Sequence, residues 1–282
     1  MKHREPAVRL DGNRIHVRDH GGAEPAILLM HGFPDNLHLY DRLLPHLSRA
    51  RRVVTFDFLG WGASDRPAAD RRTAAKQTRE VDAVIEQLRL DPVVLVAHDA
   101  SGPPAIDWAL DHPQRVAGLV LLNTYYQWTW RLRRPEAIAL YSTPIVRRLA
   151  RGVVRRFETL DRLLYSWQVG RFIRDPEVRR ELVPFLYSRF RSARPAFWEL
   201  NDDLMATALS RRKMIPRMRE FDRPVRIIFG DEDPYLNRDV ARKFHELFPR
   251  SDLFLLKGAR HYVQVDEPAE VARLILSAPF GR

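Results

Sequence analysis

The sequence predicts an α/β fold in which helices flank a mostly parallel sheet and a helical lid is inserted into a single core domain. Short apolar runs alternate with segments of helical spacing up to about residue 122 and again after residue 217. Residues 123–216, in contrast, are rich in arginine and aromatic residues and contain no convincing strand. The predicted core is therefore 1–124 and 217–282, and the predicted lid is 125–216, lying over the carboxyl ends of the strands.

The predicted strands are apolar, often β-branched runs that end at turn residues. The first two flank Asp11-Gly12-Asn13, and this short polar link predicts a β-hairpin. The later runs are almost continuously apolar, which is typical of strands covered by helices on both faces. The predicted strands lie at 8–10, 15–18, 26–30, 52–56, 93–97, 116–122, 225–229 and 253–256.

The predicted core helices follow these strands. Residues 73–90 have apolar side chains at Val81, Val84, Ile85 and Leu88, a spacing that places them on one face of a helix. The other predicted core helices lie at 37–47, 106–110, 238–248 and 267–276.

Polar residues in two loops are expected to have structural roles. His31 follows a buried strand, and we expect it to hydrogen-bond within its loop without taking part in chemistry. Ser64 and Asp65 end a glycine-containing loop that starts at Asp57. We expect them to hold this loop through bonds from side chain to backbone.

The composition limits the classes of function. The chain has 282 residues and no cysteine, which excludes disulfides, thiolate metal ligands and a thiol nucleophile. The N-terminal residues lack the apolar core of a signal peptide, and no apolar run approaches the roughly eighteen residues that span a bilayer. We predict a cytoplasmic protein with no metal, no other cofactor and no membrane partner.

The net charge of +11 raises the question of nucleic-acid binding. The arginines are spread along the whole chain, and no zinc-finger, helix-turn-helix or aromatic RNA-binding motif accompanies them. Solvated helix faces explain this distribution more simply. We therefore expect no nucleic-acid partner.

The sequence Ala97-His98-Asp99-Ala100-Ser101-Gly102 joins the apolar run at 93–96 to a helical segment. A strand, a sharp turn and a helix are the context of a nucleophile elbow. Small residues are required two positions before and after the central residue, and Ala97 and Ser101 fill those positions around Asp99. The pattern predicts that Asp99 is presented at the apex of the turn.

Two other interpretations of this turn are possible. An elbow centred on Ser101 would place Pro103 where a small residue is needed, and proline would fix φ and remove a donor at the start of the helix. Alternatively, Asp99 could serve only as the N-cap of the helix that follows.

The chain resembles the α/β-hydrolases of the epoxide hydrolase and haloalkane dehalogenase group over nearly the whole core. The resemblance rests on five motifs, at His31–Asn36, Gly60–Pro67, the Asp99 elbow, Gly230–Asp233 and Gly258–Tyr262. It implies that Asp99 is the nucleophile, His261 the base and Asp233 the acid that orients the base.

The resemblance also implies supporting roles. The backbone N–H groups of Phe33 and Ala100 would form an oxyanion hole. Asp231 and Glu232 could compete with Asp233, which is favoured because it lies three residues after Gly230. In some dehalogenases of this group the acid instead follows the strand after the elbow helix, and that position is Asn123 here.

An aspartate nucleophile implies displacement at an sp3 carbon and an alkyl-ester intermediate, which water activated by His261 then hydrolyses. Members of both subfamilies commonly have Trp after the nucleophile, and dehalogenases use it to bind the departing halide. This chain has Ala100. Epoxide hydrolases use lid tyrosines to protonate the epoxide oxygen, and the predicted lid contains Tyr141, Tyr165 and Tyr187, with Tyr141 the best candidate by position.

The leading hypothesis is an epoxide hydrolase-type enzyme that acts on a hydrophobic small molecule and water. The alternative is a haloalkane dehalogenase-like hydrolase. A third hypothesis, from another class, is a hydrolase-fold protein that binds a ligand or catalyses a non-hydrolytic biosynthetic step. Lid tryptophans are expected to be mostly core, at Trp128, Trp130, Trp167 and Trp198, with Trp167 in a position to touch a ligand.

Overall fold

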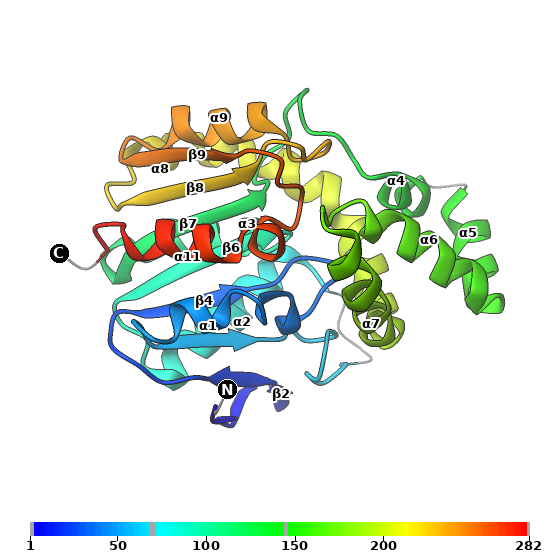
Figure 1. Cartoon of the computed structure of the whole chain (residues 1–282), viewed down its shortest axis with the longest axis horizontal. Helices are drawn as coiled ribbons and strands as arrows, with labels where there is room; N and C mark the ends of the chain where they lie inside the picture. The colour runs from blue at the N-terminus through cyan, green and yellow to red at the C-terminus, as the bar shows by residue number, and fades with distance from the viewer. Residues whose placement is uncertain (1–2, 68–71, 144–145, 281–282) are drawn as a thin grey trace.

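The computed structural model describes residues 3–67, 72–143 and 146–280. Its strands are β1 (Val8–Leu10), β2 (Asn13–Ile15), β3 (Val17–Asp19), β4 (Ala26–Met30), β5 (Val53–Phe56), β6 (Val93–Asp99), β7 (Val116–Thr124), β8 (Val225–Gly230) and β9 (Ser251–Leu256). β3 to β9 form one sheet in the order β3-β5-β4-β6-β7-β8-β9. Only the β3–β5 pair is antiparallel within the described sheet, which confirms the mostly parallel arrangement (Figure 1).

The helices of the core cover both faces of this sheet. They are η1 (Leu37–Tyr40), α1 (Leu44–Leu47), α2 (Ala74–Leu88), α3 (Gly102–Asp111), η2 (Pro113–Arg115), α9 (Arg238–Leu247), α10 (Val263–Asp266) and α11 (Pro268–Leu276). Successive residues of β6 alternate between two hydrophobic clusters, with Leu95 on the side of α2 and α3 and Val96 on the side of α1 and α11. Burial on both faces explains why the sequence of this strand is continuously apolar.

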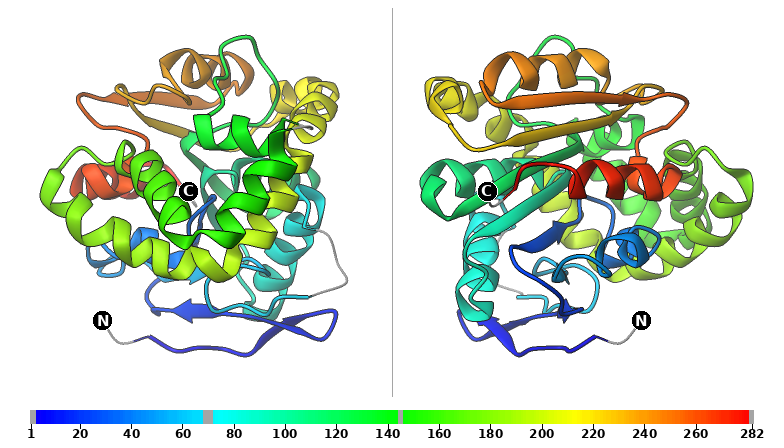
Figure 2. Two further views of the ribbon diagram at one scale, coloured as in Figure 1. Left: turned by 90° about the vertical axis from the view of Figure 1, so that its right-hand side faces the viewer. Right: turned by 60° about the vertical axis from the view of Figure 1, so that its left-hand side comes forward.

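The segment between β7 and β8 is helical, as expected. It contains α4 (Glu136–Ser142), α5 (Val146–Arg156), α6 (Glu158–Gly170), α7 (Pro176–Ser210), η3 (Arg211–Met214) and α8 (Ile215–Glu220). α4 to α7 lie at the end of the molecule toward which the parallel strands point, and the left-hand view of Figure 2 looks onto them. This position places the inserted helices over the carboxyl ends of the strands, where open α/β sheets bind ligands.

Two predicted elements differ from the structure. The helix predicted at 37–47 is instead a 3-10 turn followed by the short α1. Pro45 accounts for this difference, because it lacks an N–H group and its ring would clash with a carbonyl four residues earlier. The strand predicted at 15–18 divides at His16, where β2 ends its hairpin and β3 joins the main sheet.

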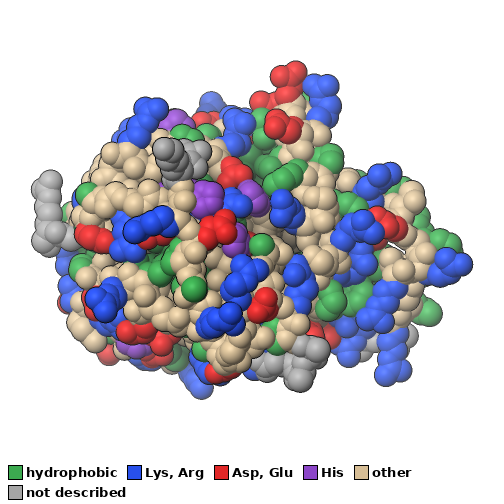
Figure 3. All heavy atoms as spheres, turned by 90° about the horizontal axis from the view of Figure 1, so that it is seen from below, with side chains coloured by type: hydrophobic (Ala, Val, Ile, Leu, Met, Phe, Trp, Pro, Cys, Tyr) green, Lys and Arg blue, Asp and Glu red, His purple; other side chains and the backbone are tan. Residues whose placement is uncertain are grey.

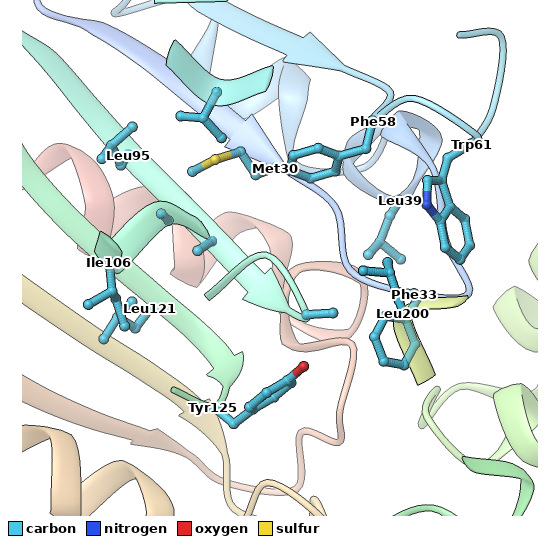
Figure 4. Close-up of a cluster of buried hydrophobic side chains, with 14 of the residues drawn as sticks. Met30, Phe33, Leu39, Phe58, Trp61, Leu95, Ile106, Leu121, Tyr125 and Leu200 are labelled. Carbon is cyan, nitrogen blue, oxygen red and sulfur yellow. The ribbon is translucent and has the colours of Figure 1, made fainter. Parts of the chain in front are cut away.

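One hydrophobic cluster runs from the sheet into the inserted helices. Figure 4 shows part of it, from Met30 and Leu95 in the sheet to Phe33 and to Leu200 of α7. The ring of Phe33 also packs against that of Phe197, with centroids 5.5 Å apart. The loop after β4 therefore connects the core to the lid through apolar contacts.

Within the described residues, no helix is both long enough and apolar enough to cross a membrane.

Candidate active site

Asp99 lies at the junction of β6 and α3, at the apex of a sharp turn. Its φ of 49° is in the left-handed region, which a residue with a side chain seldom adopts. The backbone around it is tightly packed, because a Cβ atom at Gly32 would lie 2.5 Å from that of Asp99 and one at Gly102 would lie 2.0 Å from Thr124 Oγ1. Glycine at these two positions allows the strained turn and the close approach of α3.

The structure disagrees with both alternative interpretations of this turn. The Ser101 side chain is buried, and its Oγ accepts the N–H of His98 at 2.8 Å and lies 2.8 Å from the carbonyl of Met30. That hydroxyl supports the turn and is not presented to the cavity. α3 begins at Gly102 with Ser101 in the cap position, so Asp99 is not its N-cap.

The carboxylate of Asp99 accepts backbone hydrogen bonds at the two positions predicted for an oxyanion hole. The N–H of Phe33 donates to Oδ2 at 3.2 Å, and the N–H of Ala100 also hydrogen-bonds to the carboxylate. Burial raises the pKa of Asp99 to about 6, although the charge of His261 and these N–H groups favour the anion. The site therefore holds a carboxylate that is desolvated but ionised near neutral pH.

His261 and Asp233 are paired. Nδ1 of His261 lies 2.7 Å from Oδ2 of Asp233, and both side chains are buried. The backbone N–H groups of Tyr235 and Leu236 donate to the other carboxylate oxygen at 2.8 and 3.1 Å. Burial alone would raise the pKa of Asp233, but His261 and these donors hold it below the usual value.

The protonation of His261 is set by the same pair. Burial lowers the pKa of His261, but attraction to Asp233, their hydrogen bond and the charge of Asp99 together raise it above the ordinary value. The neighbouring acids face elsewhere: Asp231 accepts the N–H of Gly258 at 2.7 Å, and the exposed Glu232 lies 3.8 Å from Arg260. Of the three acids in this loop, Asp233 is the one that contacts His261.

A cavity lies between the core and the lid, and both Asp99 and His261 line it. Most of its other lining is apolar, with Ile138, Leu164, Val169, Phe172, Phe190 and Phe197 among the side chains. A concave apolar pocket with a few convergent polar groups suits a small hydrophobic ligand.

Two of the three tyrosines considered as proton donors line the cavity. Tyr141 comes from α4 and Tyr165 from α6. The hydroxyl of Tyr165 is buried and has no hydrogen-bond partner among the described residues. Tyr187 does not line the cavity, and its hydroxyl lies 3.1 Å from Oδ2 of Asp161. Tyr141 and Tyr165 thus line the same cavity as Asp99.

Comparisons with known proteins identify the family. A family model described as alpha/beta hydrolase fold matches residues 25–268, which is most of the chain. The chain belongs to the alpha/beta hydrolase fold family.

Among curated relatives of this alpha/beta hydrolase, the Mycobacterium tuberculosis protein LipZ is 27% identical over 284 residues, covering 94% of this chain and 91% of LipZ. Haloalkane dehalogenase 2 of Mycobacterium tuberculosis is 26% identical over 274 residues, covering 93% and 90%. A haloalkane dehalogenase of Mycobacterium marinum is 29% identical over 280 residues, covering 94% and 88%. These relatives support an enzyme of the hydrolase class.

Solved structures share the fold of this alpha/beta hydrolase. A bromoperoxidase from Bacillus anthracis superposes with a TM-score of 0.75 at 22% identity, covering 98% of each chain. A meta-cleavage product hydrolase from Pseudomonas fluorescens superposes with a TM-score of 0.78 at 17% identity, covering 96% of each chain.

Sequence reasoning missed two polar features near the cavity of the alpha/beta hydrolase. Asp35 is buried, its Oδ1 accepts the hydroxyl of Tyr262 at 2.5 Å, and its Oδ2 has no partner among the described residues. Burial raises the pKa of Asp35 to about 7. Asp35 lies two residues after Phe33 in the same motif, and this position is the sequence feature that could have indicated a place near the site.

The second missed feature is a buried ion pair in the lid. Asp161 lines the cavity and pairs with Arg194 of α7. The sequence feature that could have indicated this residue is its position four residues before Tyr165, which places both side chains on the same face of α6.

His31 has the structural role expected from the sequence, whereas two of the lid tryptophans are not buried as expected. Nδ1 of His31 lies 2.7 Å from the carbonyl of Gly32, and Nε2 accepts the N–H of Phe58 at 3.2 Å, so this side chain is engaged within its loops. Trp198 is buried, but Trp130 is 91% exposed and Trp167 is 49% exposed, so the expectation that these two are lid core is wrong. Trp167 does not line the cavity either.

The supports expected from Ser64 and Asp65 are present. Ser64 Oγ accepts the N–H of His16 at 2.7 Å, and a carboxylate oxygen of Asp65 accepts the N–H of Arg14 at 2.7 Å. Among the residues that the structure describes, no group of three or more His, Asp or Glu side chains could hold a metal ion.

Proposed function

We propose that this alpha/beta hydrolase uses Asp99 as a nucleophile on a hydrophobic epoxide and forms a covalent alkyl ester. The observation that carries the proposal is the position of one buried carboxylate, at a strained turn, in an apolar cavity that also contains His261 and two tyrosines. A carboxylate can attack an sp3 carbon and form an alkyl ester. The hydroxyl of a serine in this position would instead attack a carbonyl carbon and become acylated.

In the first step an oxygen of Asp99 attacks one carbon of the epoxide. The new C–O bond forms the ester while the ring C–O bond breaks and leaves an alkoxide. The hydroxyl of Tyr141 or Tyr165 supplies the proton that this oxygen needs as it leaves. Both hydroxyls come from helices on the side of the cavity opposite the sheet.

In the second step His261 removes a proton from water, and the resulting hydroxide attacks the carboxyl carbon of Asp99. The tetrahedral oxyanion is held by the N–H groups of Phe33 and Ala100, which already bind this carboxylate. Collapse of the intermediate breaks the ester C–O bond, and the proton of the new hydroxyl group passes to the leaving oxygen, which releases the diol and regenerates the Asp99 carboxylate. The proton on His261 returns through water to the tyrosine phenolate left by the first step. Asp233 stabilises the imidazolium that forms on His261.

The change of charge during the reaction favours this sequence. The carboxylate of Asp99 is one of the groups that raise the pKa of His261. Esterification neutralises Asp99, so the pKa of His261 falls once the intermediate has formed. A neutral imidazole, which can accept a proton from water, is therefore favoured at the step that uses it.

Haloalkane dehalogenation is the second candidate, because several relatives carry that name. A departing halide needs N–H donors in a dry pocket, and Ala100 provides no side-chain donor. The indole N–H groups of Trp61 and Trp198 are buried without partners among the described residues, but neither side chain lines the cavity. The polar side chains at the cavity favour protonation of an oxygen over capture of a halide.

A panel of epoxides and haloalkanes tests the proposal. Diol formation and halide release are measured in parallel, with Asp99→Ala as the inactive control. We expect diol from hydrophobic epoxides and little or no halide. Halide release with no diol from any epoxide would favour the dehalogenase, and saturable binding without turnover would favour the ligand-binding alternative.

A further inference from the structure

The outer face of α5 and α6 carries a row of exposed hydrophobic side chains. They recur three or four residues apart along each helix, so they lie on one side of it. The row consists of Val146, Leu149 and Val153 in α5, Phe157 at the junction, and Leu160, Leu163 and Trp167 in α6. Leu149 is 73% exposed and Leu163 is 59% exposed, which is unusual for large apolar side chains grouped so closely. We call this row with its neighbouring arginines the α5–α6 face.

The charge of the α5–α6 face is strongly positive. Residues 146–170 contain six arginines and two acidic residues. Arg147 and Arg151 pair with Asp202, whereas Arg148, Arg156 and Arg162 are exposed and have no acidic partner among the described residues.

The acidic residues do not neutralise this face. Glu158 is exposed but already pairs with Arg191, and Asp161 is buried against Arg194. Figure 3 shows blue and green side chains intermingled at the end of the molecule where the lid lies. The unpaired positive charge is therefore interleaved with apolar surface.

This face is also the outermost part of the fold. α5 and α6 lie at the far end of the molecule from the chain termini, and nothing in the described structure covers them (Figures 1 and 2). α6 has two apolar sides: Leu164, Tyr165 and Val169 line the cavity, while Leu163 and Trp167 point outward. Contact with the cavity explains the apolar side that carries Leu164, Tyr165 and Val169. The outward side has no packing partner among the described residues.

We propose that the α5–α6 face docks on the surface of an anionic phospholipid bilayer. A helix with large apolar side chains on one side and arginines flanking them can lie in the interface, with its apolar side chains below the headgroups. Anionic headgroups supply the charge that the unpaired arginines lack. A nucleic acid would match the arginines but not the exposed Leu, Val and Phe side chains.

This inference departs from the expectation of no membrane partner, which rested on the absence of a membrane-spanning run. An interfacial helix needs no such run, because its apolar residues are spaced around one face and are not consecutive. The docking does not depend on the reaction proposed above.

Vesicle flotation of the full-length protein tests the proposal, with vesicles of phosphatidylcholine alone and of phosphatidylcholine mixed with phosphatidylglycerol. We expect binding to the mixed vesicles that weakens as salt is added, and weak binding to the neutral ones. Arg148→Gln/Arg156→Gln/Arg162→Gln should bind on the order of a hundredfold more weakly. Leu149→Ser/Leu163→Ser should also lose binding, including the part that persists in salt.

Control variants carry the same kinds of substitution elsewhere. Arg49→Gln/Arg219→Gln removes two exposed arginines of the core, and Leu209→Ser removes a leucine that is 50% exposed at the end of α7. These controls should bind like the unmodified protein. All the substituted residues are exposed, so unchanged thermal unfolding is expected and is verified for each variant.

A spectroscopic measurement reports on the face itself. Trp167 is half-exposed, with the guanidinium of Arg171 5.0 Å from its ring. Insertion into the interface should shift the tryptophan emission to shorter wavelength on addition of mixed vesicles, and Trp167→Phe should remove that part of the shift.

Four outcomes would overturn the proposal. They are no binding to mixed vesicles at low salt, equal binding by the α5–α6 variants, a concentration-dependent dimer that the same substitutions abolish, and retention of a DNA duplex in preference to vesicles.

Discussion

Asn123 donates from Nδ2, at 2.9 Å, to the same Oδ2 atom of Asp233 that lies 2.7 Å from Nδ1 of His261. The amide is fixed in orientation because its Oδ1 accepts the N–H of Gly230 at 2.9 Å. Asn123 lies beside the acid because it is near the end of β7, which pairs with β8, and Asp233 lies in the loop that follows β8. Position 123, which the sequence offered as an alternative place for the acid, is thus occupied by an amide that contacts Asp233.

This contact makes a prediction about position 123. Asn123→Leu leaves the buried carboxylate with one donor fewer and the N–H of Gly230 without its acceptor. It should lower the free energy of unfolding by about 1–3 kcal/mol and reduce turnover. Asp233→Asn alone should reduce turnover more. Asn123→Asp/Asp233→Asn should recover activity relative to Asp233→Asn, measured by single-turnover kinetics and thermal unfolding. No recovery in a folded double variant would contradict this prediction.

Asp99→Ala should abolish turnover and leave the fold intact, because the side chain lines a cavity and does not belong to the hydrophobic core. Turnover of an epoxide and thermal unfolding are measured on the same preparation. Asp111→Ala, at an exposed carboxylate at the end of α3, serves as the matched control. A well-folded Asp99→Ala protein with full activity would rule out the mechanism.

His261→Gln should block hydrolysis of the ester more than its formation, since alkylation requires only the carboxylate of Asp99. Mass spectrometry after incubation with an epoxide should then find the mass of the substrate on the peptide that contains Asp99. His245→Gln, an exposed histidine of α9, should accumulate no adduct. An adduct on a different peptide would mean that the roles are assigned wrongly.

Tyr141→Phe and Tyr165→Phe should each lower the rate of epoxide opening, and the double variant should lower it by about a hundredfold or more, the usual contribution of a positioned acid. Tyr187→Phe removes the same hydroxyl from a lid tyrosine that does not line the cavity, so its rate should stay near that of the unmodified enzyme. Pre-steady-state measurement of ester formation isolates this step. Equal rates in all four variants would exclude Tyr141 and Tyr165 as the proton donor.

The pH dependence should separate the two steps. With the pKa of Asp99 at about 6, the rate of ester formation should fall as the pH drops below 6 and the carboxylate takes up a proton. Ester hydrolysis needs neutral His261, so its rate should rise with pH through the pKa of that imidazole. The charge of Asp35 is among the groups that raise the pKa of His261. Asp35→Asn should therefore shift the acidic limb of hydrolysis to lower pH, and a shift toward higher pH would contradict this assignment.

The elements that surround the site could be predicted from sequence because their signals are local. The apolar run of β6, the small residues around Asp99 and the glycines of the adjoining loops each restrict the backbone within a few positions. Pro45 is also a local signal, because a proline inside a helix breaks it, and this argues against a continuous helix over 37–47.

The features missed from sequence depend on tertiary contacts. Asp35 meets Tyr262 across 227 positions of the chain, and Asp161 meets Arg194 from a different helix. The motif that contains Asp35 and the spacing of Asp161 from Tyr165 single out these acids, but neither signal identifies the partner that each acid meets in the fold. Likewise, the exposure of Trp167 depends on which side of α6 packs against the core, and apolar residues on both sides of that helix leave this undetermined.

The apolar contacts of Phe33 have a consequence for how the molecule melts. The hydrophobic cluster that includes Met30 and Leu95 in the sheet continues through Phe33 to Phe197 and Leu200 of α7 without a polar boundary. Heating that loosens α7 also removes the packing over the loop that binds Asp99, so sheet and lid should lose structure in one cooperative transition. Calorimetry should record a single heat-absorption peak, and the fragment 125–216 made alone should remain unfolded.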